Sequence, residues 1–240
     1  MSWKCACKHE NEDTSFKCGN CGRNKPQYLG IKLDITTEKL NTEQMAVWYL
    51  MVSHGFYQEA DSKLKEFEDL KSKKGNQNFI QSAINEELSK LQDKIFFYTS
   101  KCFTLLEKSL KLSPDAQIKD VNGAIQDAAS IKSNCYFCLG GLYFNNANYA
   151  DAIKNYQLSY DADPNQVSIY NIAMATINLP TDRAGLFAGK KNEQAEENKK
   201  KQEIDLLLKT IHYAPFSSFG VECGKMLLTR YGLIVTSEDF

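Results

Sequence analysis

Residues 133–166 read SNCYFCLGGLYFNNANYADAIKNYQLSYDADPNQ, and this stretch carries the strongest fold signal in the chain. Its apolar residues recur at steps of three and four, which is the spacing of one face of an α-helix. An Asn-rich turn interrupts the pattern once, and Pro164 ends it. We therefore expect two helices of similar length joined by a short turn. Gly140 and Ala152 are small enough to lie where the two helices approach most closely.

The same stretch resembles one complete repeat of the tetratricopeptide family, which has 34 residues per repeat. The residues that carry the resemblance are Tyr136, Leu139, Gly140, Tyr143, Ala152, Tyr156, Ser159 and Pro164. It implies an all-α fold in which helical hairpins stack into a right-handed superhelix, because one repeat cannot bury its apolar face alone. The expected repeat-like units are 41–74, 78–114, 133–166 and 167–217, followed by a capping helix at 218–235.

Four details of this superhelix are expected from the pattern around the repeat. Residues 203–215 align with 152–164 at an offset of 51 instead of 34, which predicts an insertion at about 180–202 whose Lys- and Glu-rich half extends a helix into solvent. Gly55 is expected at a turn between two helices. Residues 78–112 form either one helix or two, and we expect a break near Thr99. Residues 116–131 are expected to form an extra link, that is, an additional connecting segment before the repeat at 133–166.

The first 25 residues predict a separate metal-binding module, connected by a linker at 26–40. Cys5, Cys7, Cys18 and Cys21 form two close pairs, and four thiolates give Zn²⁺ a closed tetrahedral shell, which is typical of a structural site. We expect one zinc ion per chain, and its binding supplies the folding free energy of so short a segment.

Trp3, Asn11 and Gly22, at their spacing from these cysteines, make residues 3–23 similar to zinc fingers of the Ran-binding-protein type and to bacterial zinc ribbons. The resemblance implies that the Trp and Asn brace the turns that hold the metal. The first cysteine pair is one residue shorter than in those families. His9 is therefore an alternative ligand to Cys5.

A tetratricopeptide superhelix usually holds a segment of another protein against the first helices of its repeats. The first-helix residues expected to line this groove are Asn134, Phe137, Cys138, Gly141, Phe144, Asn145, Asn171, Ala175 and Asn178. Asparagine side chains can donate to and accept from a peptide backbone, so the groove would suit an extended chain of varied sequence. The alternative is that these asparagines only solvate an exposed face.

Composition narrows the function classes. The 29 basic and 30 acidic side chains nearly cancel, which argues against a general attraction to nucleic acid or to anionic membranes. No apolar run has the length of a signal peptide or a membrane span, and the paired cysteines favour a reducing, cytoplasmic location. The sequence contains no nucleotide or nucleophile motif. We expect a non-catalytic adaptor or assembly component within a larger protein complex, and the alternative is an adaptor whose finger contacts single-stranded RNA.

Overall fold

The computed structural model of the chain describes residues 2–4, 10–12, 40–72, 78–120, 122–180 and 189–236. These ranges contain seven helices and two small sheets of two strands each. The helices are α1 (Thr42–Ser72), α2 (Asn78–Leu112), α3 (Ala128–Asn145), α4 (Tyr149–Ala162), α5 (Gln166–Asn178), α6 (Gly189–Tyr213) and α7 (Ser218–Tyr231). Beyond residue 40 the described chain is all-α except for one β-hairpin, as the helical periodicity predicted.

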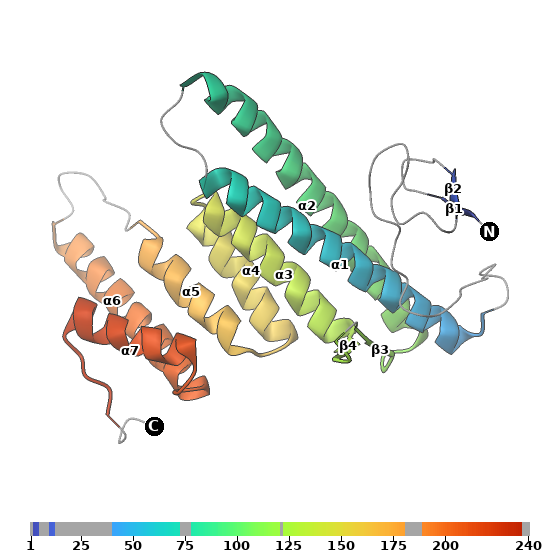
Figure 1. Ribbon diagram of the computed structural model, residues 1–240. Coiled ribbons are helices and arrows are strands. Elements are labelled where there is room, and N and C mark those ends of the chain that lie inside the picture. The colour runs from blue at the N-terminus through green and yellow to red at the C-terminus, as the bar shows by residue number, and fades with distance from the viewer. Residues whose placement is uncertain are drawn as a thin grey trace.

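The helices form one stack in which α1 is drawn between α2 and α3, and α3, α4, α5 and α6 then follow in the order of the sequence (Figure 1). α1 and α2 pack on each other as a long hairpin, and α3 packs on both of them. α4 then packs on α3, α5 on α4 and α6 on α5, while α7 contacts both α5 and α6. Each described helix therefore touches its neighbours in the sequence, which is the arrangement of a stack of helical hairpins.

The two expected N-terminal repeat units are wrong, because each of them is a single helix. α1 passes through Gly55 without a turn, and its buried residues keep their three- and four-residue spacing on both sides of that glycine. α2 passes through Thr99, whose hydroxyl donates to the carbonyl of Ile95 one turn earlier. Neither position has the proline or the capping residues that end a helix, and a lone glycine costs a helix only about 1 kcal/mol.

Residues 116–131, expected to form an extra link, contain a β-hairpin and the first turn of α3. The strands are β3 (Gln117–Lys119) and β4 (Ile125–Asp127), which pair antiparallel. The Asp120 carboxylate accepts hydrogen bonds from the backbone N–H groups of Asn122 and Ala124 at 2.8 and 2.9 Å, and Gly123 takes the positive φ of 82° that the tight turn requires. Ile118 is buried and so closes one end of the core between α1, α2 and α3.

The hairpin predicted at 133–166 is confirmed as α3 and α4, although α3 begins earlier than expected, at Ala128. Its start is set by Asp127, whose carboxylate accepts from the backbone N–H of Ser130 while the Ser130 hydroxyl accepts from the N–H of Asp127. Gly140 lies directly against the ring of Tyr156 on α4, as the close approach of the two helices predicted.

Buried serine hydroxyls connect three successive helices in this part of the stack. Ser133 on α3 donates to the carbonyl of Ser159 on α4 at 2.9 Å. The hydroxyl of Ser159 is 2.9 Å from that of Ser168 on α5. Because each buried hydroxyl has a partner, the polar groups are accommodated inside the core. Their geometry also holds α3, α4 and α5 in one register.

The C-terminal helices follow the predicted offset. Ala152, Tyr156 and Ser159 are buried on α4, and the residues 51 positions later on α6, namely Glu203, Leu207 and Thr210, are buried as well. The Lys- and Glu-rich half of the insertion extends α6 as expected, with residues 193–198 exposed. The capping helix is α7. Ser217 caps its start, and Gly232, with φ 70°, ends it.

Candidate functional site

The predicted partner-binding residues lie on α3 and α5, which both pack on α4 and contribute side chains to one hydrophobic cluster. Phe137 and Phe144 on α3 pack against a cluster that includes Tyr156 on α4 and Ile172 and Ala175 on α5. The ring centroids of Phe137 and Tyr156 are 5.3 Å apart, which is a normal distance for interacting aromatic rings. Both phenylalanines are half-buried, so each keeps one part of its ring accessible. Phe144 likewise lies 5.4 Å from the ring of Tyr149 on α4, so both phenylalanines form an aromatic cluster against α4.

The asparagines of α5 present hydrogen-bond acceptors to solvent. The Nδ2 group of Asn171 donates to the carbonyl of Val167 at 2.8 Å, and that of Asn178 donates to the carbonyl of Met174 at 2.8 Å. A carbonyl oxygen can only accept, so the bonded atom in each case is the nitrogen. Oδ1 of each side chain is then left for an external donor, since no described N–H group donates to it. This surface is suited to backbone N–H groups of an added chain.

Three of the predicted groove residues are unsuitable for contact with a partner. Ala175 and Cys138 are buried, with exposed fractions of 0% and 2%. Gly141 is also buried, and a Cβ atom at this position would be 2.9 Å from the Leu64 side chain of α1. These residues face neighbouring helices, so we remove them from the candidate surface. The sequence pattern alone could not reveal this, because α1 covers α3 from a distance of about 80 residues along the chain.

Asn145 has a structural partner that the sequence did not predict. Its Nδ2 group donates to Glu68 Oε1 on α1 at 3.0 Å and to the carbonyl of Gly141 at 2.9 Å. The side chain therefore ties the end of α3 to α1. We name the remaining set, Asn134, Phe137, Phe144, Asn171 and Asn178, the α3–α5 surface.

The four predicted zinc ligands, Cys5, Cys7, Cys18 and Cys21, lie outside the described residues. Within the first 25 residues, the structure describes an antiparallel pair of strands, β1 (Ser2–Lys4) and β2 (Glu10–Glu12), in which Trp3 pairs with Asn11. The first cysteine pair belongs to the segment between these strands in the sequence. Within the described residues, no group of three or more His, Cys, Asp or Glu side chains is placed to hold a metal ion.

The Cys-x-x-Cys pair on α3 is poorly placed for thiol chemistry. Cys135 is fully buried, and its Sγ lies 3.1 Å from Sγ of Cys102 on α2. The hydrogen bond to Cys102 and burial both raise the pKa of Cys135, and burial raises the pKa of Cys138. Both thiols therefore stay protonated near neutral pH, whereas the reactive form of cysteine is the thiolate.

His54 is the one histidine that the described core encloses. It is 5% exposed on α1, beside the β3–β4 hairpin, and its ring is 5.9 Å from that of Tyr57. Burial lowers the pKa of His54 below 6.5, and the negative charge of Asp120 opposes this only in part. The ring is thus held neutral at physiological pH, which suits a packed side chain.

No protein-family model, no curated protein and no solved structure matches this chain. Among the helices that the structure describes, none is long and apolar enough to cross a membrane.

Proposed function

We propose that this protein is a non-catalytic adaptor or assembly component that binds a segment of a partner protein on its stacked helical hairpins. The stack belongs to the tetratricopeptide type over residues 128–213, and the zinc finger of residues 1–25 is a second docking module. The partner lies along the α3–α5 surface as an extended chain. The single observation that carries this proposal is that half-buried aromatic rings of α3 share a hydrophobic cluster with α5, whose Asn171 and Asn178 each keep Oδ1 as an acceptor.

The recognition follows from the chemistry of that surface. Oδ1 of Asn171 and Asn178 accepts from backbone N–H groups, which every residue except proline offers, so contact is tolerant of sequence. Phe137 and Phe144 provide apolar contact area for one or two side chains of the partner. The surface contains no lysine or arginine at its named positions, so it has no counter-charge for a terminal carboxylate or a phosphate.

The test is a selection of peptides from a displayed random library on the immobilised full chain, followed by fluorescence anisotropy to measure the dissociation constant of each enriched peptide. We expect Asn171→Ala together with Asn178→Ala to weaken binding by a factor of about 5 to 150, since each of the two lost hydrogen bonds is worth about 0.5–1.5 kcal/mol. Asn155→Ala is the matched control. Asn155 on α4 makes the same bond to the carbonyl four residues earlier, but it lies off the α3–α5 surface.

Two results would count against this function. If no peptide is enriched, or if the α5 variant and the Asn155 control bind equally well, the α3–α5 surface is not the docking site. A filter-binding titration with single-stranded RNA tests the alternative. Affinity that persists and falls with salt would favour an RNA-associated adaptor.

A further inference from the structure

The outward side of α7 is apolar although it ends the described stack. Val221 and Leu228 are 49% and 52% exposed, and Gly224 stands between them. The three residues lie on one side of the helix because they are spaced by three and four. Phe216 just before α7 is 96% exposed, and Leu233 just after it is 42% exposed. We call Phe216, Val221, Gly224, Leu228 and Leu233 the terminal face.

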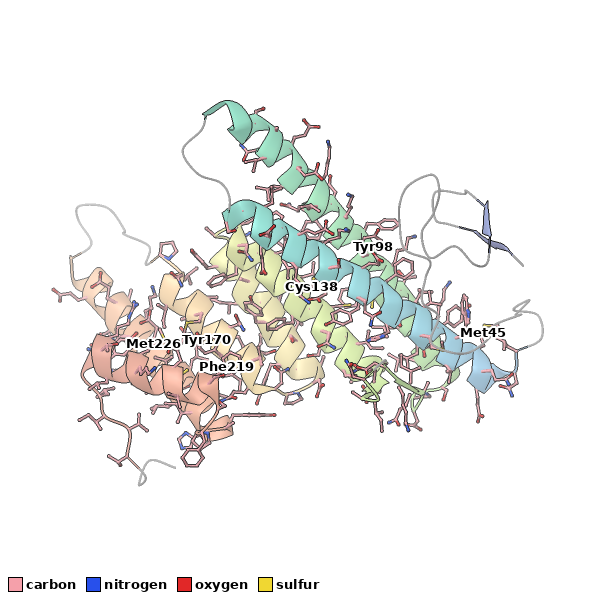
Figure 2. The ribbon with its side chains drawn as sticks, viewed as in Figure 1. Met45, Tyr98, Cys138, Tyr170, Phe219 and Met226 are labelled. Atoms are coloured by element: carbon pink, nitrogen blue, oxygen red, sulfur yellow. The ribbon has the colours of Figure 1, made fainter. Side chains whose placement is uncertain are left out.

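The buried side of α7 occupies the place of a first helix in a hairpin. Three buried residues of α5, Ile169, Ile172 and Thr176, correspond at an offset of 51 to three buried residues of α7, Gly220, Cys223 and Leu227. Figure 2 shows Tyr170 of α5 beside Phe219 and Met226 of α7, and the Tyr170 and Phe219 rings are 4.9 Å apart. α7 thus packs on the preceding helices as the next first helix would.

The same offset of 51 residues indicates which kind of element would cover the terminal face. Val221, Gly224 and Leu228 correspond to Tyr170, Ala173 and Ile177 of α5. Those α5 residues pack in the cluster that also contains Leu207 of α6. On α5 these positions are covered by a following helix, whereas on α7 no described residue covers them. The end repeat of a solenoid normally has a polar outer side, so the natural occupant of this face is another helix.

The distribution of the apolar residues along α7 indicates that the helix covering the terminal face comes from a second copy of the chain. Val221 and Leu228 lie equally far from the centre of α7, and Phe216 and Leu233 flank its two ends. A two-fold axis at the centre of the helix would place Val221 of one copy against Leu228 of the other. It would bring the Phe216 end of each copy to the Leu233 end of its partner. Such self-complementarity is what an isologous dimer interface requires.

Gly224 permits this pairing and has no other packing role in the described structure. A Cβ atom at this position would meet no atom within 4 Å, so no described neighbour needs a glycine there. Glycine inside a helix costs about 1 kcal/mol relative to alanine. At the crossing point of two antiparallel helices, however, its lack of a side chain lets the two backbones approach closely.

The charged groups near the terminal face are compatible with the pairing. Arg230 is directed to the buried Glu203 of α6, with 3.8 Å between Nε and Oε2. In the antiparallel arrangement, the charged groups nearest to each other along the axis are the two Lys225 side chains, whose flexible stems let both ammonium groups turn into solvent. We propose that the protein forms a homodimer through antiparallel contact of the terminal faces of two α7 helices.

The test is the oligomeric state of the full chain, measured by sedimentation equilibrium between about 5 and 200 µM. A single pair of helices buries less than the roughly 1,200 Å² of a standard stable interface, so we expect a dissociation constant in the micromolar range. The mass should then rise with concentration from that of the 27.2 kDa chain towards twice that value. Val221→Glu together with Leu228→Glu should hold the protein monomeric at every concentration.

Two further variants keep this test decisive. Gly224→Glu should also give a monomer, and it cannot fail for lack of space, because the position is open and the change favours a helix. Phe97→Glu removes a 53% exposed apolar side chain from α2 and should leave the dimer unchanged. A monomeric wild-type chain at about 200 µM, or a dimer that survives both α7 variants, overturns the proposal. A monomer whose terminal face binds a helix of another protein overturns it equally.

Discussion

The contact between Gly140 and Tyr156 gives a direct test of how closely α3 and α4 pack. A Cβ atom at Gly140 would lie 2.6 Å from Cδ1 and Cε1 of the Tyr156 ring. Carbon atoms in contact are normally about 3.5–4.0 Å apart, so Gly140→Ala forces the ring or a helix to move by about 1 Å. Tyr156 is only 3% exposed and packs against Phe137, so its ring has little room to turn away.

The expected magnitude follows from two opposing effects. Overpacking of a buried contact costs about 1–3 kcal/mol, while replacing glycine by alanine inside a helix gains about 1 kcal/mol. We therefore expect Gly140→Ala to lower the free energy of unfolding by about 0–2 kcal/mol. Gly55→Ala is the matched control, because Gly55 lies inside α1 with no atom within 4 Å of the added Cβ. That variant should be more stable than the wild type by about 1 kcal/mol.

Urea unfolding followed by circular dichroism measures both variants. The difference between them isolates the overpacking cost and should be about 1–3 kcal/mol, or several degrees in melting temperature for a chain of this size. In a Tyr156→Leu background the added methyl group has room, so Gly140→Ala should become stabilising. If Gly140→Ala stabilises the wild type as much as Gly55→Ala does, the described contact is absent and the reasoning is refuted.

Four further predictions concern separate parts of the molecule. Cys18→Ser with Cys21→Ser should abolish stoichiometric zinc, measured by atomic absorption, and leave the helical circular dichroism nearly intact; loss of both would show that finger and helices are not separate modules. Because burial lowers the pKa of His54, the unfolded chain takes up the proton first, so the free energy of unfolding should decrease as the pH falls below 6.5. The urea midpoint should show this slope, and His54→Gln should flatten it; an equal slope in the variant excludes His54 as its source. Iodoacetamide followed by mass spectrometry should leave Cys135 unlabelled until the protein unfolds, and rapid native labelling would contradict its burial. Ala147 has a positive φ of 57° in the α3–α4 turn, so Ala147→Gly should raise the melting temperature, and a decrease would contradict that backbone conformation.

The helical periodicity of the sequence was sufficient to predict most of the helices. It identified the α3–α4 hairpin, the displaced second helix α6 and the final helix α7, and the offset of 51 residues aligns buried residues of α4 with buried residues of α6. These features are local, because helix spacing, capping residues and small residues at a crossing can be read within about 34 residues. Where a stop signal was absent, as at Gly55 and Thr99, we inferred breaks that do not exist, because we expected each of these segments to be a repeat of two helices.

The α3–α5 surface has features that could not be predicted from the local sequence pattern. The sequence placed Asn171 and Asn178 on the first helix α5, but the direction of their amides depends on hydrogen bonds that only the folded helix provides. The burial of Gly141 and the tie between Asn145 and Glu68 depend on how α1 lies against α3. No pattern within either helix contains that information.

The amino-acid sequence by itself determined which segments become helices and which side of most of them is apolar, since both depend on interactions within a few turns of the chain. The tertiary structure alone decided which of those sides stay exposed. The long α1–α2 hairpin covers part of α3, while nothing in the described chain covers Val221 and Leu228 of α7. Exposure is a property of the neighbours that a helix meets, and these neighbours come from distant parts of the chain or from another molecule.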